Sequence, residues 1–270
     1  MAVKRKNIDL LEGGISLKFG VCTDPANMEL AKECGYDFTE FMVMKLDELS
    51  DEDVSGIEKK CDKLGMKIEV MNCMLPERLQ VTGPKVDLKV IKDYLLKNMA
   101  RASKFGCEAI VFGSAWARNM PEGFSDKKKA FSQLVEYLHI ASDICGEHGI
   151  TIVIEPLHGT NIISFISEGH YLLHLADRKN VQLLGDIFAM VQNFESSEDL
   201  VTYAKHIKHL HFCSHDRKFP RMNDRFDYSP FFEAVKRSGY NERLSIEANV
   251  SDDIRKDFVD ALAVMKHYIP

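Results

Sequence analysis

The 270-residue sequence contains seven cysteines but no C-x-x-C pair, and an odd number of cysteines cannot all be bridged within one chain. Cys22 and Cys213 lie inside apolar runs, where a free thiol behaves as a small hydrophobic group. These features exclude a disulfide framework and are typical of a reducing compartment, so we expect a cytoplasmic protein.

The sequence also lacks a long apolar run and an excess of basic residues. No stretch approaches the roughly 20 apolar residues of a membrane span, and the charged start of the chain has no apolar segment behind it, so we expect neither a membrane helix nor a secretory leader. The net charge is −6, which argues against a nucleic-acid partner held through phosphate contacts.

Short strand-like segments alternate with amphipathic helical segments along the whole chain, which predicts a single-domain α/β (β/α)8 TIM barrel over residues 1–270. No predicted strand is followed by G-x-G-x-x-G or G-x-x-x-x-G-K-S/T, which disfavours an open doubly wound sheet. Residues 1–14 are predicted to be an N-terminal extension. The predicted strands span 15–22, 37–41, 67–72, 109–112, 151–154, 181–186, 207–213 and 243–247.

Cap residues and glycines set the expected helix boundaries. Asp24 followed by Pro25 starts the first helical segment, and Ser125 is expected to cap a helix that ends at Gly149. The predicted helices span 28–34, 46–64, 87–104, 125–147, 167–176, 197–205, 229–238 and 252–268.

Four metal-competent side chains stand at the ends of the last four predicted strands: Glu155, Asp186, His211 and Glu247. The carboxyl ends of barrel strands meet at one face, and adjacent strands lie about 4.8 Å apart, so four consecutive strand ends can surround one ion. Three carboxylates and one imidazole suit a hard or borderline divalent cation such as Mn²⁺, Mg²⁺, Co²⁺ or Zn²⁺. Without a cation, their mutual repulsion would be costly.

These motifs resemble the xylose-isomerase-like TIM barrels, the sugar isomerase/epimerase superfamily that includes the ketose 3-epimerases. The resemblance extends over nearly the whole chain from Ile15 onward, and its most telling segments are 111–114, 121–124, 154–157, 184–186, 209–211, Arg217 and 245–247. It implies that Glu155, Asp186, His211 and Glu247 bind one divalent metal ion, with Mn²⁺ favoured. It also implies that Glu155 and Glu247 are the catalytic acid/base pair.

The activity implied by the resemblance is isomerisation or epimerisation of a sugar or sugar phosphate. One glutamate would remove a proton next to a carbonyl, the metal would stabilise the enediolate, and the other glutamate would return the proton. Arg217 matches a substrate-contacting arginine of the family. Trp116 and His158, in loops after the fourth and fifth strands, are further candidates for substrate binding.

One departure from the family pattern concerns the run after Asp186. Close relatives usually carry a substrate-contacting histidine three residues after this aspartate, where the present chain has Ala189. Two alternatives stay open: a keto-sugar or keto-cyclitol dehydratase or lyase on the same metal site, and a catalytically impaired sugar-binding barrel. An apurinic endonuclease is discounted, because the ends of the second to fourth strands lack histidine and the net charge has the wrong sign. A homo-oligomer is compatible with the sequence, which does not fix the oligomeric state.

Overall fold

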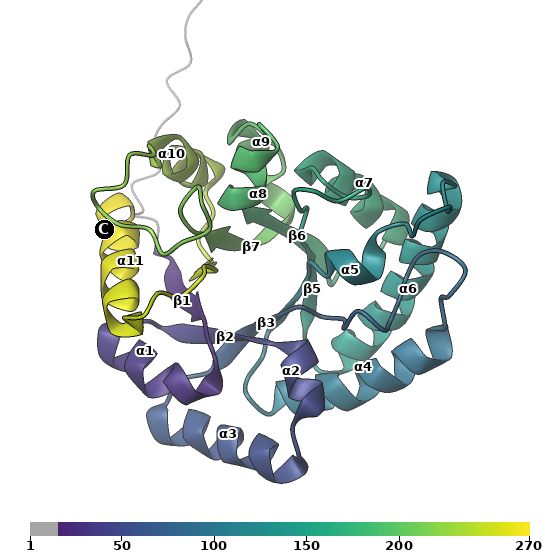
Figure 1. Cartoon of the computed structure of the whole chain (residues 1–270), viewed down its shortest axis with the longest axis horizontal. Coiled ribbons are helices and arrows are strands. Elements are labelled where there is room, and N and C mark those ends of the chain that lie inside the picture. Colours follow the sequence, from purple (N-terminus) through teal and green to yellow (C-terminus); the bar gives the residue numbers. More distant parts are fainter. Residues whose placement is uncertain (1–15) are drawn as a thin grey trace, which may run out of the picture.

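The computed structural model describes residues 16–270, in which eight parallel strands close into a barrel in sequence order, β1 to β8. The helices lie outside the strands and form a ring around them, and α11 at the end of the chain packs against α1 (Figure 1). The predicted single-domain TIM barrel is confirmed. The predicted extension, residues 1–14, lies outside the described residues.

The eight strands agree with the predicted ones to within a few residues. The segments 109–112, 151–154 and 181–186 agree at both ends, because each is an apolar run bounded by a glycine, a proline or a helix start. The strands are β1 (Lys18–Cys22), β2 (Phe38–Met42), β3 (Ile68–Asn72), β4 (Ala109–Phe112), β5 (Thr151–Ile154), β6 (Val181–Asp186), β7 (Ile207–Phe212) and β8 (Arg243–Ile246).

The connections carry a helix between successive strands and several extra short helices. The helical elements are η1 (Pro25–Asn27), α1 (Met28–Cys34), α2 (Val43–Glu48), α3 (Asp51–Leu64), α4 (Leu88–Ser103), α5 (Ala115–Arg118), α6 (Lys127–Glu147), α7 (Ile166–Ala176), α8 (Ile187–Gln192), α9 (Glu198–Thr202), η2 (Ala204–His206), α10 (Ser229–Ser238) and α11 (Ile254–Tyr268).

The buried hydrophobic residues form two clusters, one on each face of the barrel wall. The larger one fills the layer between the strands and the helical ring. The smaller one consists of buried residues from alternating positions of β2 to β6, including Phe38, Val111 and Leu184. Side chains alternate between the two faces of a strand, so the residues two positions beyond Phe38 and Leu184, Glu40 and Asp186, continue the inner face toward the carboxyl end.

The predicted helix 46–64 is wrong, because two helices occupy this stretch. Leu49 and Ser50 are extended, and Ser50 begins α3 through a capping box: its hydroxyl accepts a hydrogen bond from the Asp53 N–H at 3.1 Å, and the Asp53 carboxylate accepts the Ser50 N–H at 3.1 Å. The apolar residues on both sides of the break obscured it in the sequence.

Other helix boundaries also differ from the predictions. Asp126, and not Ser125, caps α6, since its carboxylate accepts the Lys129 N–H at 2.9 Å. The predicted helix 197–205 is divided into α9 and η2, and the short helices α5 and α8 were not predicted. Both of the unpredicted helices directly follow a strand end, where they shape the carboxyl face of the barrel.

All seven cysteines carry free thiols, as the odd number and the spacing predict. Among the described residues, 16–270, no helix combines the length and the apolar character needed to cross a membrane.

The capping of α6 gives a direct test of the corrected helix start. Asp126→Ala should lower the free energy of unfolding by about 1 kcal/mol, because the Lys129 N–H loses its acceptor. Ser125→Ala is the matched control and should change it by less than about 0.5 kcal/mol, as for most exposed substitutions. Denaturant unfolding of both variants measures this, and the reverse order would return the cap to Ser125.

Candidate active site at the carboxyl end of the barrel

Three of the four predicted ligands meet at the carboxyl end of the barrel. Nδ1 of His211 lies 3.0 Å from Oε1 of Glu155 and 3.4 Å from Oε2 of Glu247. One ligand atom from each of the three side chains lies within 4.8 Å of the other two. Glu155 follows β5, His211 lies in β7 and Glu247 follows β8, so closure of the barrel is what brings them together.

Asp186, the fourth predicted ligand, is buried at the end of β6 but is separated from this group by a guanidinium. Arg217 places Nη1 3.5 Å from Oδ2 of Asp186, and its Nη2 pairs with Oε2 of Glu247. Asp186 also caps α8, because its Oδ1 accepts the Phe188 N–H at 3.0 Å. That all four side chains surround one cation therefore stays a prediction.

The position of Arg217 depends on an unusual backbone conformation. Its φ is +63°, in the left-handed region that non-glycine residues rarely adopt. Its N–H donates to the Ser214 carbonyl at 3.0 Å, and its guanidinium lies 5.0 Å from the centre of the Phe188 ring. The turn after β7 thus directs the side chain back over the barrel mouth, between Asp186 and Glu247.

Glu40, in β2, is a central residue of the site that the sequence analysis missed. Its Oε1 lies 3.0 Å from Nε2 of His211, and its Oε2 lies 3.0 Å from Nε2 of His209; all three side chains are fully buried. Burial opposes ionisation, but His211 and His209 outweigh it and hold the pKa of Glu40 well below its usual range. An ionised carboxylate only accepts, so both Nε2 atoms donate to Glu40.

This arrangement fixes the role of the His211 ring. Because Nε2 donates to Glu40, Nδ1 is the atom directed toward Glu155 and Glu247. Burial alone would lower the pKa of His211, but the carboxylates of Glu40 and Glu247 raise it well above the usual value. The ring therefore carries a proton on Nδ1 as well, and a metal ion bound there would replace that proton.

The carboxyl groups around His211 differ in their electrostatic environments. Burial and the neighbouring Glu155 raise the pKa of Asp186 to about 7, and burial also raises the pKa of Glu155. The pKa of Glu247 is lowered despite its burial, because His211 and Arg217 stabilise its charge. The carboxylates outnumber the cationic side chains His211 and Arg217 here, an arrangement that a bound cation would stabilise.

A second set of donor atoms lies on the other side of the His211 ring, where Cys22, Glu40 and His211 also bring atoms within 4.8 Å of one another. Burial and the adjacent Glu40 raise the pKa of the Cys22 thiol well above its usual range, so the sulfur stays protonated. Metals bind the thiolate form, which favours the Glu155–His211–Glu247 side for a cation.

Gly113, directly after β4, makes room for Glu155. A Cβ atom at this position would overlap Oε2 of Glu155 and would approach its Cδ to 3.0 Å. The glycine therefore allows the Glu155 carboxylate to lie against the neighbouring strand end. The segment 111–114 was part of the family resemblance, but the contact that explains the glycine becomes visible only in three dimensions.

A cavity of about 420 Å³ opens next to these residues, within the usual size range of small-ligand sites. Glu40, Asn72, Arg217 and Glu247 form part of its wall, and Lys45 adds a further charged group. The wall thus offers both hydrogen-bond donors and acceptors, which suits a small molecule with several hydroxyl groups.

Trp116 and His158 lie in the loops where they were predicted, but they do not line this cavity. The indole N–H of Trp116 donates to the Leu75 carbonyl at 2.7 Å, and the ring is 41% exposed. His158 is exposed, and its Nδ1 lies 2.9 Å from Oδ1 of Asn193. Substrate contacts by these two residues remain predictions.

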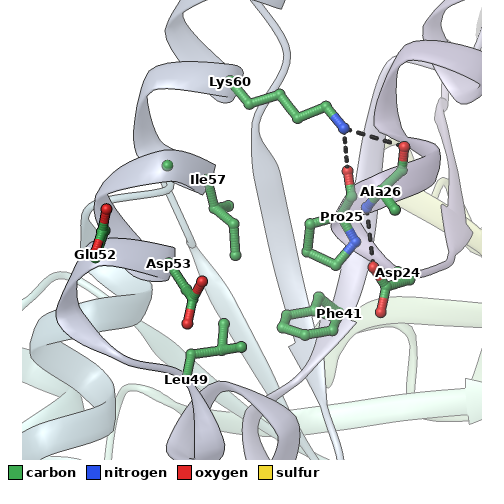
Figure 2. Close-up of a pocket in the computed structure, with 10 residues that line it drawn as sticks. Asp24, Pro25, Ala26, Phe41, Leu49, Glu52, Asp53, Ile57 and Lys60 are labelled. Atoms are coloured by element: carbon green, nitrogen blue, oxygen red, sulfur yellow. Dashed lines mark hydrogen bonds between the residues drawn. The ribbon is translucent and has the colours of Figure 1, made fainter.

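A groove of about 360 Å³ between η1 and α3 shares Asp24 and Phe41 with the cavity wall. Figure 2 shows the Lys60 side chain reaching across it to the carbonyls of Pro25 and Ala26, at 2.8 and 3.1 Å. The ammonium is thus used in holding η1 in place, and Asp53 belongs to the α3 capping box. We assign this groove a structural role.

The family model described as xylose isomerase-like TIM barrel matches residues 28–268. The chain belongs to this family. The matched segment extends from the start of α1 to the end of α11 and so includes all four predicted metal ligands. A comparison with curated proteins gives no match.

Several solved structures have the same fold at low sequence identity. A D-psicose 3-epimerase studied with D-fructose is 18% identical, with a TM-score of 0.82 over 93% of this chain and 99% of its own. The D-allulose 3-epimerase from Methylomonas sp. is 17% identical (TM-score 0.81; 94% and 98%). The 3-keto-D-glucoside 4-epimerase from E. coli is 16% identical (TM-score 0.79; 93% and 100%). Such low identities show the fold alone.

Substitution of Gly113 tests the space reserved for Glu155. Gly113→Ala should lower the free energy of unfolding by about 1–3 kcal/mol, because the new methyl group must displace the buried carboxylate. Gly56→Ala, in the open interior of α3, has no atom within 4 Å of the added Cβ and should stabilise the protein by up to about 1 kcal/mol. Equal effects of the two substitutions in denaturant unfolding would contradict the proposed crowding.

Proposed function

We propose that the protein is a divalent-metal-dependent sugar isomerase or epimerase that acts by proton transfer at a carbon next to a carbonyl. The observation that carries the proposal is the convergence of Glu155, His211 and Glu247 at the ends of three strands. The solved structures with the same fold include epimerases of ketoses and of a keto-glucoside, which supports a sugar as the substrate class. We propose a cytoplasmic location from the free thiols.

The residues present fit a hard or borderline cation such as Mn²⁺, because the donor set consists of carboxylate oxygens and one imidazole nitrogen. Glu155, His211 and Glu247 would hold the ion, and Asp186 would join them once Arg217 releases it. When bound, the cation would supply positive charge to the oxygens of a developing enediolate.

The protein's own side chains would perform the proton transfer. Glu155 and Glu247 come from β5 and β8, and their carboxylates approach the same His211 nitrogen, so a substrate between them would meet one carboxylate on each side. One would remove the proton and the other would return it. The pKa of Glu155 is raised and that of Glu247 is lowered. Two carboxyl groups with pKa values shifted in opposite directions are typical of an acid and base pair.

Arg217 is the proposed substrate-orienting residue. Its guanidinium lies at the cavity wall with 29% of its side chain exposed, and it contacts both Asp186 and Glu247. Substrate hydroxyl groups that pair with these carboxylates would compete with it. Ala189, which replaces the family's usual histidine, is buried in α8, where its N–H donates to Asp186 at 3.4 Å.

A panel of ketoses, incubated with protein and Mn²⁺ in heavy water and followed by NMR, tests the reaction class. Inversion of a stereocentre with solvent deuterium incorporated at that carbon is the expected result. Loss of water or of an aglycone would replace the epimerase with a dehydratase or lyase. Ligand binding without any deuterium incorporation would indicate a sugar-binding barrel instead.

The proposed acid/base pair gives a test by substitution. Glu155→Gln and Glu247→Gln should each lower the rate of solvent-deuterium exchange by about 100- to 10,000-fold, because an amide neither accepts nor returns the proton. Glu108→Gln is the control, because Glu108 pairs with Lys67 and Arg243 at the opposite end of the barrel. This variant should show the wild-type rate of solvent-deuterium exchange. A variant with the wild-type rate would remove its glutamate from the mechanism.

Glu40 is proposed as a positioning residue for His211. Glu40→Gln should weaken Mn²⁺ binding by about 10- to 100-fold, because an amide oxygen can accept from only one of the two imidazoles and no longer fixes the ring. Calorimetric titration of the metal-free protein measures the affinity directly, without reference to activity.

Glu69→Gln is the matched control for the Glu40 variant. Glu69 is also a buried strand glutamate, but it pairs with Lys18 and Arg243. Equal Mn²⁺ affinities of the Glu40 and Glu69 variants would show that Glu40 does not position the ligand.

A further inference from the structure

Three histidines gather at the amino end of the barrel, opposite the candidate active site. His170 and His174 lie one turn apart on α7, and His206 directly precedes β7. The ring centres of His170 and His174 are 4.5 Å apart, those of His170 and His206 are 5.1 Å apart, and those of His174 and His206 are 6.4 Å apart. The proposed sugar chemistry uses none of them.

These imidazoles are accessible, and the surroundings of His170 and His206 favour the neutral form that ligates metals. His174 is exposed, while His170 and His206 are half-buried. Burial and the neighbouring His174 lower the pKa of His170, and burial and His170 lower that of His206. Nδ1 of His206 lies 3.2 Å from Oε1 of Gln182, so the Nε2 atom of this ring remains available.

We propose that His170, His174 and His206 form a second metal site that binds one borderline divalent ion of the Zn²⁺, Ni²⁺ or Cu²⁺ class. Two histidines four residues apart on one helical face are a common chelating pair, and three imidazoles complete the protein part of many zinc sites. The third ligand comes from a different element, so the ion would join α7 to the start of β7.

The ring separations fit such a site. With metal–nitrogen bonds of about 2.0–2.1 Å and tetrahedral angles, the centres of two coordinated imidazoles lie about 5 Å apart. The observed separations of 4.5, 5.1 and 6.4 Å bracket this value. The rings now meet edge to face or tilted, so binding requires them to turn until their nitrogens converge, a rotamer change within reach of partly exposed side chains.

The three imidazoles of the proposed second site prefer other metal ions than the donor atoms of the candidate active site do. Carboxylates dominate around His211 and favour hard ions, whereas three imidazoles favour Zn²⁺, Ni²⁺ and Cu²⁺ over Mn²⁺ or Mg²⁺. Lys205 and Lys208 add positive charge near His206 and disfavour its protonation. The second site is therefore independent of the proposed sugar chemistry.

Titration of the metal-free full-length protein with Zn²⁺ by calorimetry tests the site. Wild-type protein should bind one more equivalent than His174→Ala, and His170→Ala and His206→Ala should each lose the same equivalent. His267→Ala, which removes an exposed helical histidine elsewhere, should bind like the wild type. Circular dichroism confirms that each variant is folded.

Electron paramagnetic resonance of one bound equivalent of Cu²⁺ provides a second measurement, with coupling to three imidazole nitrogens expected in wild type and to fewer in the His174 variant. The same number of Zn²⁺ equivalents in wild type and all three cluster variants would overturn the proposal. The test compares the wild type with the three histidine variants. Its outcome is therefore independent of whether Glu155, His211 and Glu247 bind a metal ion.

Discussion

The site depends on one buried hydrogen-bonded chain that runs from β2 through β7 to β5 and β8. Glu40 accepts from both His209 and His211, and His211 in turn contacts Glu155 and Glu247. A buried carboxylate is tolerated only when its oxygens are satisfied, and here each oxygen has an imidazole partner at 3.0 Å. The chain couples the first half of the barrel to the strand ends that carry Glu155 and Glu247.

The charge balance of this chain supports the proposed cation. Four carboxylates, Glu40, Glu155, Asp186 and Glu247, face two cationic groups, Arg217 and the His211 imidazolium. His209 contributes no charge, since burial lowers its pKa to about 4. Ionisation of all four carboxylates would leave two uncompensated negative charges, and the raised pKa values of Glu155 and Asp186 reflect this excess. A divalent ion would relieve it without protonating either group.

The sequence was sufficient for the fold and for most of the residues at the strand ends, because both follow from local patterns. Apolar runs that stop at a charged residue identified β5 and β6, and a barrel places all such endings on one face. Glu40 was missed because a single acidic residue inside β2 is indistinguishable in sequence from one that faces solvent. Its partners, His209 and His211, lie about 170 residues away, so only closure of the barrel reveals them.

Other features could not be predicted because they depend on specific turns. The separation of α2 from α3 at Leu49 and Ser50 follows from a capping box between Ser50 and Asp53. In the sequence alone, Asp53 is equally compatible with the interior of one continuous helix. The left-handed conformation of Arg217 is set by the turn that begins at Ser214. Arginine has no preference for this conformation, so the sequence does not indicate it. Without that turn the guanidinium would not reach both Asp186 and Glu247.

The segments after β6 and β7 determine where the guanidinium of Arg217 lies at the cavity wall. The barrel and its strand ends are common to the fold, whereas the segments after β6 and β7 supply Phe188, Ala189 and Arg217. The Phe188 ring lies against the guanidinium that bridges Asp186 and Glu247, so a side-chain change in α8 moves a charge at the cavity wall. How α8 holds Arg217 therefore determines which charges line this part of the cavity.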